Sequence, residues 1–102
     1  MQLIQLLLPL YNNQKELFPE HYYTQIREEL TENFGGITTY SRAPATGLWK
    51  ETEAKTVKDA IIIYEVMAEE LDRTWWQEYK EKLKRLFEQD EILIRSWGID
   101  LH

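Results

Sequence analysis

The sequence predicts an α+β domain in which two helices cover one face of a four-stranded antiparallel sheet. Four short runs rich in Leu, Ile, Val and Tyr have the composition of strands, and two longer segments carry apolar residues at helical spacing. The segments follow one another as strand, helix, strand, strand, helix, strand. Because 102 residues are the size of one domain, we expect residues 1–102 to share a single core.

The first strand and the first helix are predicted near the N-terminus. Leu3–Leu10 is apolar and is closed by Pro9. This run has no basic leader or small-residue cleavage site and is too short to cross a bilayer, so we interpret it as a buried strand. Phe18-Pro19 favours a helix start because proline suits a first turn. The helix is predicted to end at Gly35-Gly36, which can supply a left-handed cap.

The middle of the chain contains a short strand and the strand around which the sheet is built. Ile37–Arg42 is rich in β-branched and aromatic residues and is predicted as the second strand. Thr56–Val66 is apolar on both faces and is predicted as a central strand. The phase of the second strand stays open. Its outward residues are either Thr38, Tyr40 and Arg42 or Ile37, Thr39 and Ser41.

The second helix and the last strand complete the pattern. Asp72 is the predicted N-cap of a helix, and Glu91–Ile99 has the composition of a strand. One ring of the Trp75-Trp76 pair is expected in the core and the other at the surface. Glu29 of the first helix is expected to face water. On the wet side of the second helix, i,i+4 pairs are predicted between Glu78 and Lys82 and between Glu81 and Arg85.

This order of elements is the ferredoxin-like βαββαβ pattern, with the first and third strands at the centre of the sheet. Helices cover only one face in such a fold, so the other face must meet water, a ligand or a partner. That face is predicted to be apolar with polar and aromatic groups placed on it, as is typical of a binding surface. The predicted interface or ligand residues are Gln5, Tyr40, Arg42, Trp49, Glu65, Arg95 and Trp97.

Two functions fit such a face. The first is a homodimer of the dimeric α+β-barrel kind, in which two copies press these faces together or bind a small ligand between them. The second is a cofactor-independent enzyme, monooxygenase-like or isomerase-like, acting on a small polar or aromatic substrate. Tyr40, Arg42 and Arg95 would then bind the substrate, and Glu65 or His21 would act as the base. The lack of any catalytic motif favours the first function.

Composition argues against several other classes. Eighteen acidic and twelve basic residues give a net charge of −6, which disfavours nucleic acid and anionic membranes and favours a soluble cytoplasmic protein. With no cysteine, thiolate chemistry and Cys-based zinc sites are excluded. His21 lacks a nearby second histidine, since His102 is terminal, so we expect no metal site. No phosphate-binding glycine motif is present, and no cofactor is expected.

Three short motifs carry a resemblance to a group of small bacterial proteins. They are Phe34–Tyr40 (FGGITTY), Gly47-Leu48-Trp49, and the segment from Tyr79 to Ile92 with its Phe-x-Gln sequence. In this order and spacing they resemble ferredoxin-like proteins of unknown function with an FGG-(I/V)-T-x-Y, G-x-W and F-x-Q pattern. The resemblance implies a ferredoxin-like fold that often occurs as dimers. It carries over no catalytic residue.

Overall fold

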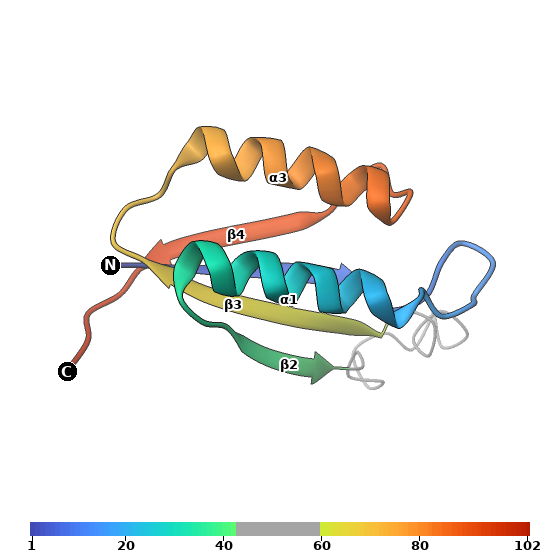
Figure 1. Cartoon of the computed structure of the whole chain (residues 1–102), viewed down its shortest axis with the longest axis horizontal. Coiled ribbons are helices and arrows are strands. Elements are labelled where there is room, and N and C mark those ends of the chain that lie inside the picture. The colour runs from blue at the N-terminus through green and yellow to red at the C-terminus, as the bar shows by residue number, and fades with distance from the viewer. Residues whose placement is uncertain (43–59) are drawn as a thin grey trace, which may run out of the picture.

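The order of strands and helices in the computed structural model, which describes residues 1–42 and 60–102, is the predicted one (Figure 1). The antiparallel sheet has the strand order β2-β3-β1-β4, so β1 and β3 are central. This is the α+β arrangement of a ferredoxin-like fold. The elements are β1 (Gln2–Pro9), α1 (Glu20–Phe34), β2 (Thr38–Arg42), β3 (Ile61–Ala68), α3 (Arg73–Leu86) and β4 (Leu93–Gly98).

The central strand β3 differs most from its prediction. The sequence predicts Thr56–Val66, whereas the described strand runs from Ile61 to Ala68, and residues 56–59 lie outside the described part of the chain. The C-terminal shift brings Met67 into the strand. Met67 belongs to β3 because it pairs with Leu3 of β1, and such pairing is not visible in the pattern of one strand alone.

The predicted helix ends are largely confirmed. Pro19 is the N-cap of α1, so this helix begins one residue after the predicted Phe18-Pro19 start. Gly35 has φ 82° and its N–H donates to the Thr31 carbonyl at 2.8 Å, as expected for a left-handed cap. At the start of α3 the Asp72 side chain accepts a hydrogen bond from the Trp75 N–H at 3.0 Å.

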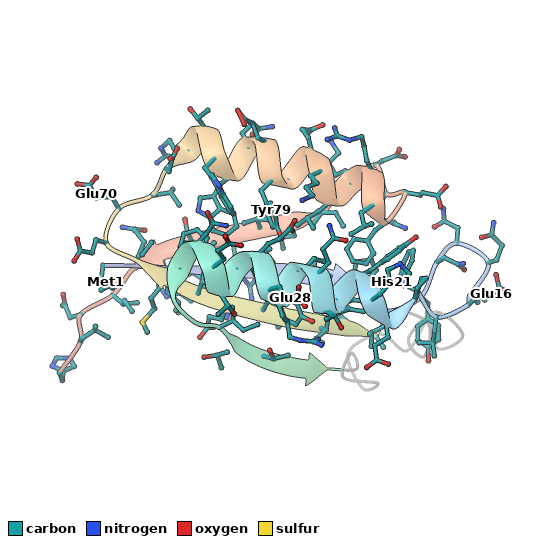
Figure 2. All side chains as sticks on the ribbon, viewed as in Figure 1. Met1, Glu16, His21, Glu28, Glu70 and Tyr79 are labelled. Atoms are coloured by element: carbon teal, nitrogen blue, oxygen red, sulfur yellow. The ribbon has the colours of Figure 1, made fainter. Side chains whose placement is uncertain are left out.

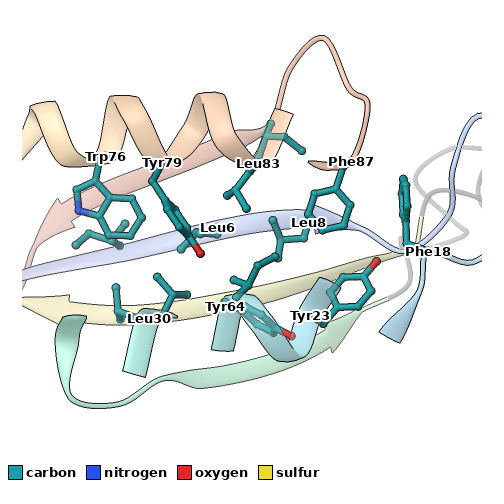
Figure 3. Packing of buried hydrophobic residues seen from close by; sticks show 14 residues of the cluster. Leu6, Leu8, Phe18, Tyr23, Leu30, Tyr64, Trp76, Tyr79, Leu83 and Phe87 are labelled. Carbon is teal, nitrogen blue, oxygen red and sulfur yellow. The ribbon is translucent and has the colours of Figure 1, made fainter. Parts of the chain in front are cut away.

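Both helices pack on the same sheet face, and their apolar sides meet alternate residues of β1 and β3 (Figure 3). Trp76 is buried in the core as expected, whereas Trp75, predicted at the surface, is half-buried and packs against the core. Phe87, directly after α3, is fully buried among aromatic rings. The buried cluster consists of Ile4, Leu6, Leu8, Phe18, Tyr23, Ile26, Leu30, Tyr64, Val66, Trp76, Tyr79, Leu83, Phe87 and Ile92.

A polar contact joins α1 to α3, where the sequence predicted only solvated charges. Tyr79 points from α3 toward α1 (Figure 2), and its hydroxyl donates to Glu29 Oε1 at 2.9 Å. Lys82 also binds Glu29, and Lys84 pairs with Glu81. The predicted water-facing position of Glu29 and the predicted partners of Lys82 and Glu81 are therefore wrong. Helical periodicity describes one helix at a time, whereas these side chains meet between two helices.

The contact changes the pKa values of Glu29 and Tyr79. Burial opposes ionisation of Glu29, but the hydrogen bonds from Lys82 and Tyr79 outweigh it and lower the pKa of this carboxyl below its ordinary value of 4.5. Burial, followed by the hydrogen bond to Glu29, raises the pKa of Tyr79 far above 10.0. At neutral pH the contact thus consists of a neutral phenol, a carboxylate and an ammonium group.

We expect Glu29 to make stability depend on acid. A carboxyl whose pKa is lowered in the folded state contributes stability above its unfolded pKa and loses it as pH falls through the folded value. Replacing Glu29 with Gln should cost about 1 kcal/mol at neutral pH, because partial exposure weakens these charged hydrogen bonds. Thermal unfolding between about pH 7 and pH 3 checks this, and the difference in Tm from the native chain should shrink toward acid.

The matched control for this measurement is Glu28→Gln. Glu28 is an exposed neighbour on α1, and within residues 1–42 and 60–102 its side chain makes no hydrogen bond or ion pair. Its substitution removes the same charge, so it should leave Tm and its pH dependence nearly unchanged. An equal effect of the two substitutions would mean that helix charge, and not the contact with Tyr79 and Lys82, determines the acid response.

Candidate functional site: the helix-free sheet face

The strand register determines which residues share the face opposite the helices. Residues directly opposite each other in an antiparallel pair lie on the same side of the sheet. Gln5 of β1 lies opposite Glu65 of β3 and Arg95 of β4, which makes a polar row across three strands. Thr38 of β2 continues this row beside Glu65. Of the two phases predicted for β2, the register therefore selects the one that places Thr38, Tyr40 and Arg42 in the rows of the helix-free face.

The polar row is held together by the side chain of Gln5. Its amide nitrogen donates to Glu65 Oε2 at 2.6 Å, and its amide oxygen accepts from Arg95 Nε at 2.9 Å. An amide can serve both charges at once because it carries a donor and an acceptor. The row thus presents a carboxylate on one side of β1 and a guanidinium on the other, and their charges sum to zero. We call Glu65, Gln5 and Arg95 the polar relay.

Apolar residues flank the polar relay, and their exposure is uneven. Ile63 of β3 is 4% exposed, so this part of the face is already covered within the chain. By contrast, Met67 is 48% exposed, Leu93 49% and Trp97 42%. Leu3 lies between Met67 and Trp97 in one row of the sheet. The prediction of a bare apolar face therefore holds toward β4 and the end of β3 but not at Ile63.

The structure brings together only part of the predicted site. Gln5, Glu65 and Arg95 are in direct contact. Tyr40 and Arg42 belong to β2, where the register places them opposite Ile63 and Ile61. Trp49 lies outside the described residues.

His21 does not join the relay. It is exposed at the start of α1 (Figure 2), and its ring meets the edge of the Tyr22 ring, with centroids 5.0 Å apart. Because α1 lies on the other side of the sheet from the polar relay, His21 and Glu65 cannot act on one small molecule in this arrangement.

A cavity of about 260 Å³ opens at the rim of the face, where α1 connects to β2. Glu65, Thr38 and Met67 are among the residues that line it. Sequence reasoning missed Met67 because it placed the end of β3 too early; extending the period-two pattern past Val66 would have found it. No group of three His, Asp or Glu side chains able to hold a metal occurs among residues 1–42 and 60–102.

Together these features define a small α+β protein with a helix-covered core and a partly exposed, amphipathic sheet face. No helix in the described part of the chain is long and apolar enough to cross a bilayer. Comparison of the chain with protein-family models, curated proteins and solved structures found no match.

Proposed function

We propose that the protein is a homodimer whose subunits pack through their helix-free sheet faces. The observation that carries the proposal is the combination of three exposed apolar side chains, Met67, Leu93 and Trp97, with the polar relay beside them. Met67 and Trp97 lie in the row on one side of the polar relay and Leu93 in the row on its other side. Exposed apolar side chains around a few polar groups, with Trp and Met among them, are typical of interfaces. We place this dimer in the cytoplasm, because the net charge of −6 keeps the chain soluble and disfavours anionic membranes.

The polar relay is self-complementary, as a two-fold interface requires. Two sheets pack face to face about 10 Å apart. If the two-fold axis runs along β1 above Gln5, it exchanges the β3 side of one subunit with the β4 side of the other. Glu65 then lies against Arg95 of the second copy, and Met67 lies against Trp97 of the second copy. Both contacts are favourable, one as an ion pair and one as a sulfur–aromatic contact.

The rim cavity adds ligand binding to the proposal. Its wall includes Glu65 and Met67, which also belong to the proposed interface, so a second subunit would close over it. A space of about 260 Å³ suits a small molecule with few polar groups. We favour binding over catalysis at this place because the described structure puts no histidine near Glu65, and Gln5 already holds this carboxylate.

Sedimentation of the native chain and of Trp97→Ala tests the dimer. The native chain should sediment as a dimer at micromolar concentration. Loss of an interface tryptophan typically costs about 2 kcal/mol or more, so the substitution should weaken dimerisation about 30-fold. Leu101→Ala is the control, since Leu101 is 64% exposed in the C-terminal tail, outside the described strands. A native monomer at micromolar concentration, or unchanged dimerisation of Trp97→Ala, would remove the proposal.

A further inference from the structure

We infer that a groove between α3 and β4 is a binding site for a small organic anion, a carboxylate attached to an apolar body. The groove encloses about 250 Å³ on the helix-covered side of the sheet. It lies on the other side of the sheet from the proposed dimer interface, because Ser96 and Ile94 on its wall lie opposite the core residues Ile4 and Leu6. Arg95 of the edge strand β4 is the one member of the polar relay that also lines the groove.

The floor of the groove is apolar. Ile4 and Trp76 form part of it, and both are almost fully buried. Leu71 and Ile94 are half-buried and close its sides. Such a floor excludes water from the body of a ligand and favours an aliphatic or aromatic group of a few carbon atoms.

The rim of the groove is cationic and polar. Arg73 and Lys80 reach it from α3, one on either side of Gln77 along the helix, and Ser96 offers a hydroxyl from β4. Arg95 completes the lining. None of the carboxylates in the described segments 1–42 and 60–102 lines this cavity, although the chain contains eighteen acidic and twelve basic residues. A cationic rim in an acidic protein is therefore a local feature that composition does not explain.

Arg73 is available to a ligand. Within residues 1–42 and 60–102 its side chain makes no ion pair or hydrogen bond. Lys80, by contrast, pairs with Glu91 at 2.8 Å. The Glu91 side chain is 70% exposed, so this pair is screened by water and can open at little cost when an anion enters. A guanidinium binds a carboxylate in bidentate fashion, and the ammonium, amide and hydroxyl groups can satisfy its remaining lone pairs.

Titration of the native protein with benzoate, followed by NMR and calorimetry, tests the site. The indole N–H signal of Trp76 should shift with benzoate, since this ring lines the groove. Benzylamine has the same ring and the opposite charge, so it should not bind. If phenyl phosphate binds more tightly than benzoate, the groove prefers a phosphate monoester, and the proposal that its ligand is a carboxylate is overturned. Absence of a benzoate-dependent shift at millimolar concentration would overturn the site.

Substitutions at the rim test its electrostatics. Arg73→Gln should weaken benzoate binding about tenfold, since it removes a charged hydrogen-bond donor. Arg85→Gln is the matched control, because Arg85 is exposed on the same helix and does not line the groove. Glu91→Gln should strengthen binding several-fold by freeing Lys80. Equal binding by Arg73→Gln and Arg85→Gln, or weaker binding by Glu91→Gln, would contradict the site. All three substitutions avoid the polar relay, so failure here leaves the dimer untouched.

Discussion

Replacing Phe87 with alanine is expected to lower the free energy of unfolding by about 3–5 kcal/mol. Phe87 is fully buried where the end of α3 meets the start of α1. Its ring packs edge-on against Phe18, with centroids 4.9 Å apart, and tilted against Tyr23 at 5.6 Å. The substitution removes apolar burial and leaves a cavity that three surrounding rings are too rigid to fill.

Urea unfolding of Phe87→Ala measures this loss, with Leu17→Ala as the control. Leu17 is 65% exposed in the loop before α1, so its truncation should change stability by less than about 0.5 kcal/mol. Phe87→Leu should recover part of the loss, because it restores much of the apolar volume. If Phe87→Ala lowers the free energy of unfolding by less than about 1 kcal/mol, the conclusion that this aromatic cluster joins the two helices is wrong.

Reversing the charge at either end of the polar relay is expected to abolish the homodimer at micromolar concentration. Under the proposed two-fold axis, Arg95→Glu places two carboxylates against each other, and Glu65→Arg places two guanidinium groups against each other. Each arrangement occurs twice in a symmetric dimer. Disrupting an interfacial charge pair costs about 2–5 kcal/mol, so the dissociation constant should rise by two orders of magnitude or more.

Mixing the two single variants provides the control for this result. In a heterodimer of Arg95→Glu with Glu65→Arg, both contacts again join opposite charges, so dimerisation should return. Such rescue distinguishes a contact across the interface from a loss of folding, which mixing cannot repair. Two variants that remain monomeric when mixed, although each unfolds cooperatively by heat, would exclude the proposed axis. Dimers of either variant alone would place the interface elsewhere.

The candidate site was predictable in composition but not in arrangement. Gln5, Glu65 and Arg95 could be assigned to one face because alternation along a strand determines which side chains share it. Their contact depends on how β1 is aligned with β3 and β4, two strands that are far from it in the sequence. Local periodicity carries no information about such register. The contact of Glu29 with Tyr79 was missed for the same reason, since it joins two helices fifty residues apart.

By itself the sequence determined the α+β class, the order of elements, the helix ends at Asp72 and Gly35, and the apolar sides that form the core. These features follow from interactions between residues close in the chain, such as caps and the two periodicities of helix and strand. The tertiary structure alone decided the contacts of the polar relay, the burial of Ile63, the exposure of Met67 and the cationic groove under α3. Each of these depends on which distant side chains meet, and packing in three dimensions, not local preference, selects those neighbours.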